Sequence, residues 1–160
     1  VFDEGGNLLC TNRCATLFPS LGGYGGEPLP RRESRIPARA PDYTADAHIA
    51  GNQHLLYRLT GDTNLVHIDR DTIQRQGLEG PVVHDLCAFG FACRLGVEAL
   101  FPGQPERLER MYAAMKTVLY PDTPIQLQLW KLEEGKAAFR LVNRDSGKAI
   151  LDRGELDWRG

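Results

Sequence analysis

The spacing of apolar residues predicts helices in the middle of the chain. From Asp46, which can cap a helix, the pattern is helical, and Gly61 is a natural stop. The apolar stripe of this first helix consists of Ile49, Leu55, Leu56 and Leu59. A short polar helix is expected at residues 71–76. Residues 82–101, with Pro81 suited to the first turn, are apolar on nearly every face, so this helix must be surrounded by other elements.

Beyond Pro102 the pattern changes to the two-residue alternation of β-strands. "IQLQLWKL" and "AAFRLVN" alternate, "NRDSGK" is a turn, and "AILDRGELDW" fits a last strand. Residues 107–120 are ambiguous, because their apolar spacing and local propensities are helical. One buried helix followed by three or four antiparallel strands predicts an α+β domain. In such a domain a curved antiparallel sheet wraps a long central helix.

The N-terminal segment does not fit that domain. "DEGGN" is a turn between two short apolar runs, which predicts a hairpin. A lone hairpin is marginal in water, so we expect it to join a sheet built from residues absent here. "GGYGG" lacks the features of a phosphate-binding loop and predicts a tight chain crossing. A proline- and arginine-rich stretch follows and is typical of an extended linker, although its arginines could also contact a diphosphate-bearing ligand.

Composition narrows the class of protein. The chain has 160 residues, 42% apolar and 25% charged, with a net charge of −2, which is typical of an ordinary globular domain without a nucleic-acid or membrane partner. The cysteines form no C-x-x-C pair, and we expect reduced core residues of a cytosolic or organelle-matrix protein. They are Cys10, Cys14, Cys87 and Cys93. Neither a metal centre nor a cofactor is expected.

Two polar clusters are candidates for chemistry. Asp62, Asn64 and His67 lie on the loop between two predicted helices, where a carboxylate and an imidazole reaching one water would form an acid/base pair. The ordinary alternative is two turn formers and a surface histidine. His84 and Asp85 fall in the first turn of the buried helix, whose free N–H groups can hold an oxyanion. An acid there also simply stabilises the helix, by about 0.3–1 kcal/mol.

Three stretches together resemble a known family. "YRLTGDTNLVHID" resembles the signature of the type 2, R-specific enoyl-CoA hydratases, members of the MaoC-like dehydratase family. "GPVVHDLCAFGFACR" and "YPDTPIQLQLWK" are similar to the two motifs that follow it in that family, in the same order and spacing. The resemblance extends from about residue 51 to residue 158.

The resemblance implies a hot-dog fold, and it assigns the ambiguous segment to a strand. Members with two hot-dog repeats in one chain imply a division of this sequence. Residues 1–26 would be the last hairpin of a degenerate first repeat, 27–45 a linker, and 46–160 the catalytic hot-dog domain. The missing first half would be a separate chain or fragment, or would be replaced in a homo-oligomer such as a dimer.

The resemblance also implies a lyase that acts on an acyl-CoA thioester without a cofactor, in the cytoplasm or, in a eukaryote, the peroxisomal matrix. Asp62 and His67 would be the catalytic pair and would add one water across a trans-2-enoyl thioester, or remove it again. Asn64 would fix the loop and the water. The backbone N–H of Asp85, beside His84, would hold the thioester oxygen.

Departures from the family pattern leave alternatives open. Leu65 stands where the family has proline, and Val118 and Asp122 stand where it often has proline and glycine. Asp85 replaces a glycine, and its carboxylate would repel an oxyanion. One alternative is therefore a non-catalytic, acyl-thioester-binding or structural hot-dog subunit. Another is a thioesterase, which shares the fold but lacks the Asp-x-Asn-x-x-His loop.

Overall fold

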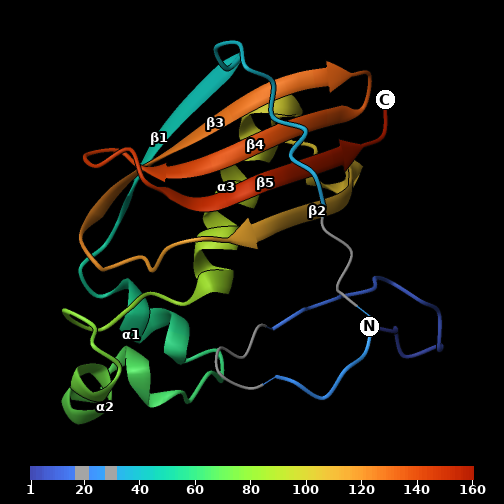
Figure 1. Cartoon of the computed structure of the whole chain (residues 1–160). Helices are drawn as coiled ribbons and strands as arrows, with labels where there is room; N and C mark the ends of the chain where they lie inside the picture. The colour runs from blue at the N-terminus through green and yellow to red at the C-terminus, as the bar shows by residue number, and fades with distance from the viewer. Residues whose placement is uncertain (17–21, 28–31) are drawn as a thin grey trace. The chain divides into compact units, whose positions relative to one another are not determined.

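The computed structural model describes residues 1–16, 22–27 and 32–160. They belong to two compact units, Val1–Arg32 and Glu33–Gly160 (Figure 1). The second unit contains all the helices and strands assigned in the described residues.

The first unit shows the predicted hairpin turn in a minimal form. Phe2 and Leu8 pair in an antiparallel bridge, and the Asp3 carboxylate accepts a hydrogen bond of 2.8 Å from the backbone N–H of Asn7. No strand follows as far as residue 16, and residues 17–18 of the expected returning strand lie outside the described residues. The backbone hydrogen bonds of the hairpin extend from the turn to Val1, which bonds to Leu9 and Cys10.

The second unit is a five-stranded antiparallel sheet with one long helix. Its elements are β1 (Tyr43–Ile49), α1 (Gln53–Arg58), the 3-10 turn η1 (Leu65–His67), α2 (Arg70–Arg75), α3 (Asp85–Leu100), the 3-10 turn η2 (Pro105–Arg107), β2 (Leu108–Met115), β3 (Thr123–Glu133), β4 (Lys136–Asn143) and β5 (Ala149–Trp158). The strand order is β1-β3-β4-β5-β2, and α3 lies across one face of the sheet (Figure 1). This is the hot-dog arrangement that was expected, in the α+β class.

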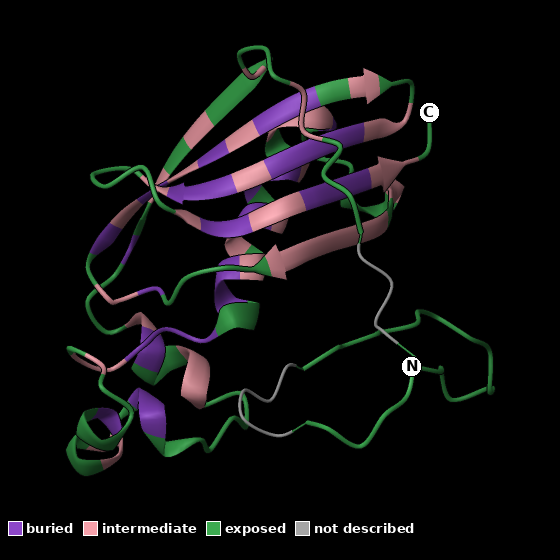
Figure 2. Cartoon of the chain, in the orientation of Figure 1, coloured by how far each residue is buried: buried purple, intermediate pink, exposed green. Residues whose placement is uncertain are grey.

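The core lies between α3 and the inner face of the sheet. Buried and partly exposed residues alternate in β3 from Thr123 to Leu129, as its two-residue periodicity predicted, whereas β4 and β5 bury runs of two or three successive residues (Figure 2). The helix packs closely where its residues are small: a Cβ on Gly96 would lie 2.7 Å from the Cδ1 of Leu156. Small residues at this contact allow α3 to approach the sheet closely.

The expected helix from Asp46 is wrong in its first half. Asp46 lies in β1, which pairs with β3 along its whole length, and α1 begins only at Gln53. Alanines and one isoleucine alternate inward on β1, and small residues gave too weak an apolar signal to reveal a strand. Nor do the leucines form an inward stripe, because Leu55, Leu56 and Leu59 are exposed.

The other elements differ from expectation mainly in their ends. The polar helix is confirmed as α2, and β2 confirms the strand assignment of the ambiguous segment, although it ends at Met115. The long helix begins at Asp85 rather than near Pro81, because Val83 is extended and its N–H bonds to the carbonyl of Leu119 at 2.7 Å. β1 begins at Tyr43, three residues before the expected start of the domain.

Two remaining expectations concern the cysteines and membranes. All four cysteines are free, but only Cys87 is buried, so the prediction of core residues is wrong for the exposed Cys10 and Cys14. In the part of the chain that the structure describes, none of the helices combines the length and the apolar character that crossing a membrane requires.

Candidate active site

The loop after α1 turns the carboxylate of Asp62 toward the start of α3. Its Oδ1 accepts a hydrogen bond of 3.0 Å from the backbone N–H of Asn64, whose own Oδ1 accepts one of 3.3 Å from Val66. The guanidinium of Arg58 donates to the carbonyls of Asp62 and Thr63 at 3.1 and 3.3 Å. These bonds fix the loop on α1 and leave Asp62 Oδ2 to face the histidines.

His67 ends the 3-10 turn and is buried. Its Nδ1 lies 2.7 Å from the carbonyl oxygen of Val82. A carbonyl can only accept, so Nδ1 carries the proton and Nε2 presents a lone pair. That Nε2 is 3.9 Å from Asp62 Oδ2. The two groups predicted to share a water molecule therefore converge.

His84 completes the cluster. It is the N-cap of α3, and its ring stacks on that of His67 with centroids 3.5 Å apart and planes inclined by 19°. Its Nε2 is also 3.9 Å from Asp62 Oδ2, and the ring of Tyr57 lies 4.7 Å from the other side. Burial lowers the pKa of His84, as does His67, while Asp62 partly opposes this shift.

Asp85 is the first residue of α3 and its side chain is exposed. Protein around the carboxyl nevertheless removes part of its hydration and raises its pKa, against the influence of His67. The backbone N–H of Asp85, the first residue of the helix, has no intrahelical acceptor. The N–H group expected to face an oxyanion therefore belongs to a residue that also carries a carboxyl group.

The structure brings Asp62, His67 and His84 together, places Asp85 at the adjoining helix start, and makes Asn64 a brace within its loop. Sequence analysis missed His54, which is buried on α1 with Nδ1 unpartnered in the described structure. Burial lowers the pKa of His54, and His67 adds to this. A polar residue facing inward among exposed leucines leaves no periodic signal in the sequence.

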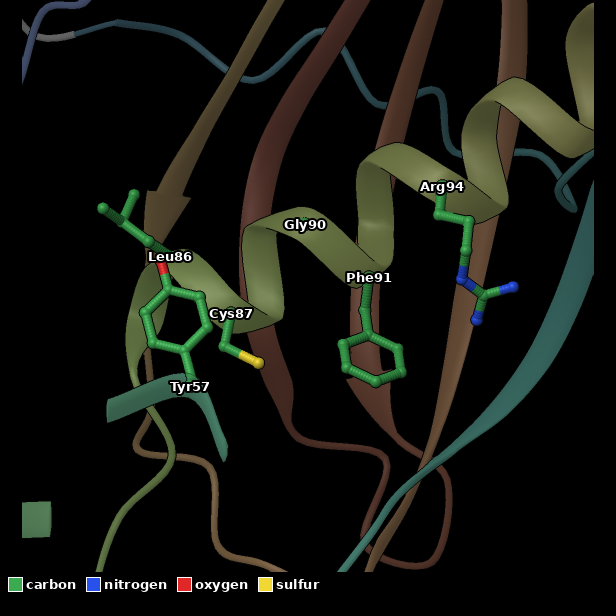
Figure 3. Close-up of a pocket in the computed structure, with 6 residues that line it drawn as sticks. All are labelled: Tyr57, Leu86, Cys87, Gly90, Phe91 and Arg94. Carbon is green, nitrogen blue, oxygen red and sulfur yellow. The ribbon is translucent and has the colours of Figure 1, made fainter. Parts of the chain in front are cut away.

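A cavity of about 260 Å³ opens beside the cluster. Figure 3 shows Tyr57 and Leu86 at one end of its lining and Arg94 at the other. The remaining lining residues are Cys87, Gly90 and Phe91. Tyr57 thus lines the cavity and also packs against His84, with ring centroids 4.7 Å apart.

The cluster provides a hydrogen-bond acceptor on each side of one small site. A water molecule bonded at about 2.8 Å to both Asp62 Oδ2 and His67 Nε2 fits their separation of 3.9 Å. Such a water can lose a proton to one acceptor while the helix start holds negative charge. Two arginines of the linker pair elsewhere, Arg39 with Asp42 and Arg35 with Glu133, and Arg31 lies outside the described residues.

The fold and this geometry define a class: a hot-dog domain with a carboxylate and two histidines gathered at the start of its central helix. The comparison with protein families agrees. Residues 33–150 match the MaoC like domain, and the chain belongs to that family.

Relatives with curated descriptions are longer than this chain. It is 29% identical over 157 residues to the mouse peroxisomal multifunctional enzyme type 2, covering 96% of this chain and 21% of that protein. It is 28% identical over 170 residues to the peroxisomal enoyl-CoA hydratase 2 of Arabidopsis thaliana, covering 99% of this chain and 54% of the relative. The chain thus spans about half or less of these relatives.

A solved structure shares the fold of this chain and spans a longer chain. The MaoC-like dehydratase of Phytophthora capsici superimposes with a TM-score of 0.81 at 32% identity, covering 88% of this chain and 50% of that one. Over this length the fold and the family are shared.

Proposed function

We propose that this chain adds water to trans-2-enoyl-CoA thioesters to give R-3-hydroxyacyl-CoA, or catalyses the reverse dehydration. The observation that carries the proposal is the approach of Asp62 Oδ2 to within 3.9 Å of His67 Nε2 beside the start of α3. The descriptions of the relatives as hydratases and dehydratases support it.

The reaction needs a water activated on one face of the double bond. Asp62 and His67 each accept one hydrogen of that water, so its oxygen lone pair faces the β-carbon. As the bond between the water oxygen and the β-carbon forms, one acceptor takes a proton from the water, and the same group then delivers this proton to the α-carbon. The elements of one water are thereby added, with no other reactant.

The thioester carbonyl gains negative charge as the bond forms. The backbone N–H at Asp85 supports this oxygen, and losing such a donor typically costs about 2.7–4 kcal/mol. The cavity beside Tyr57 and Phe91 takes the acyl chain, because its side chains are mainly apolar.

The test is the hydration rate of a crotonyl thioester, followed by loss of the enoyl absorbance. We expect Asp62→Asn and His67→Ala each to lower kcat by about 10²–10⁴-fold, since each removes one acceptor of the water. His48→Ala is the matched control, because His48 pairs with Asp122 in an exposed ion pair of 2.9 Å outside the site. Unchanged rates in both site variants would refute the assignment.

Asp85 favours a second candidate, a subunit that binds acyl thioesters without turnover. Its carboxylate opposes an oxyanion at the helix start. Calorimetry that shows binding of a CoA thioester to a protein with no hydration rate would support this function. Release of free CoA would instead indicate a thioesterase.

The wider context is also part of the proposal. We assign residues 1–26 to the end of a degenerate first repeat, 27–45 to a linker and 46–160 to the catalytic domain, because the relatives are about twice this length or more. The second hot-dog comes from a first repeat or from another copy of this chain. Sedimentation velocity separates these cases, since only the latter gives a dimer of this chain alone. We place the protein in the cytoplasm or, in a eukaryote, the peroxisomal matrix.

A further inference from the structure

The site has a second property that hydration does not require. One ligand atom each from Asp62, His67 and His84 lies within 4.8 Å of the others. We propose that these three residues bind Zn²⁺, or a chemically similar divalent cation, and that the bound metal blocks hydration. The binding stands independently of the proposed function, whereas the inhibition rests on it.

The distances suit such an ion. Zinc binds imidazole nitrogen and carboxylate oxygen at about 2.0–2.2 Å, so two ligands of a tetrahedral ion lie about 3.4 Å apart. Asp62 Oδ2 is 3.9 Å from both Nε2 atoms. The three ligand atoms lie within 4.8 Å of one another, so the side chains must move closer by up to about 1.4 Å when the ion binds. Asp62, whose side chain is exposed, moves most easily.

His67 has the second contact that metal-binding histidines normally make. Such histidines usually donate their other ring N–H to a carboxylate or a backbone carbonyl, which fixes the ring and its tautomer. The Nδ1 of His67 makes this bond with Val82 at 2.7 Å. Its Nε2 therefore needs no rearrangement to act as a ligand.

His84 provides the independent observation. The residue is only 3% exposed, yet neither ring nitrogen has a hydrogen-bond partner among the described residues. Buried polar atoms without partners are rare because their lost hydration is not replaced. A cation held between Asp62 and His84 supplies the missing partner for Nε2.

The ligand chemistry selects among metals. Two imidazole nitrogens and one carboxylate favour zinc, copper or nickel over magnesium and calcium, which prefer all-oxygen sites. Three protein ligands leave one position open to solvent. Since Asp62 and His67 are the acceptors of the proposed catalytic water, a metal that occupies both removes that water's binding site.

Calorimetric titration with Zn²⁺ tests the binding. It should use a chain carrying Cys10→Ser and Cys14→Ser, because these exposed thiols would bind zinc themselves. We expect one equivalent to bind, and His84→Ala to weaken the affinity by at least about tenfold. Asp62→Asn should do the same. His48→Ala, which removes an exposed histidine already paired with a carboxylate, should have no effect.

Circular dichroism of each variant shows whether the variant is still folded, so a loss of zinc binding can be told from a loss of folding. Absence of saturable binding overturns the proposal, as does equal weakening in the His48→Ala control. In the hydration assay, zinc should inhibit and a chelator should restore the rate. If zinc binds but hydration continues, the inhibitory role is wrong. If zinc binds but the chelated enzyme has no hydratase activity, the proposed function fails and the metal site stands.

Discussion

At the scale of single residues, Asp85 is the position where a substitution should change the chemistry of the site most directly. Its backbone N–H supports the proposed oxyanion, while its carboxyl, with a raised pKa, opposes it when ionised. The backbone N–H and the side chain of Asp85 thus have opposite effects on the stability of the proposed oxyanion.

Replacing Asp85 by glycine should separate the two effects. We expect Asp85→Gly to raise kcat/KM for hydration about tenfold, which corresponds to about 1.4 kcal/mol of transition-state stabilisation. The helix should lose about 0.3–1 kcal/mol of stability, because the acid no longer faces its N-terminus. Steady-state kinetics and thermal melting measure the two quantities.

Asp71→Gly is the matched control, since Asp71 is the acid in the first turn of α2 and is not in the site. It should lower stability without changing the kinetics. A fall in kcat/KM in Asp85→Gly would instead indicate that the carboxyl takes part in the reaction or in substrate binding.

At the scale of secondary-structure elements, the contact between β4 and β5 depends on one residue without a side chain. Gly154 is paired with Phe139, and a Cβ at this position would lie 2.5 Å from the aromatic ring. Because Phe139 is fully buried, its ring has no solvent to move into.

Gly154→Ala should therefore lower the free energy of unfolding by about 1–3 kcal/mol, as overpacked cores commonly do. Denaturant titration measures the loss. Gly90→Ala is the control: it lies in α3, nothing lies within 4 Å of its Cβ position, and alanine favours a helix by about 0.5–1 kcal/mol. A stable Gly154→Ala variant would show that β4 and β5 can separate enough to admit a methyl group.

At the scale of the whole molecule, buried histidines couple folding to pH. The pKa of His54 is lowered in the folded chain by burial and by His67 relative to its ordinary value of 6.5. The unfolded chain then binds the proton more tightly, so acidification favours unfolding. Stability is complete above about pH 6.5 and falls as the pH drops toward the folded value.

The free energy of unfolding, measured with a chelator present, should therefore decrease between pH 7.5 and pH 5.5. This window lies above the region where carboxylates such as Asp42 titrate. His54→Gln, which carries no titrating group, should show a smaller decrease, while His48→Gln at an exposed position should match the parent. An equal decrease in all three proteins would mean that His54 is hydrated in the folded state.

The sequence by itself determined the features that depend on neighbours in the chain. The alternation in β3 and the apolar run of α3 are local patterns, and each appeared as predicted, although α3 begins later than expected. β4 and β5 also formed as strands, but their burial does not alternate. Asp62 and His67 were predicted to lie on one short loop, and the hydrogen bonds of Asp62 stay within this loop and α1. His67 instead bonds to the carbonyl of Val82, outside the loop.

The tertiary structure decided what depends on distant residues. β1 is a strand because β3 offers it a full ladder of partners, which its own alanines do not signal. His84 stacks on His67 because Val83 pairs with Leu119, far along the chain. The cavity and the buried His54 likewise arise only when α1 packs beside α3. Periodicity records which face of an element is apolar, but the partner of that face is fixed only by long-range packing.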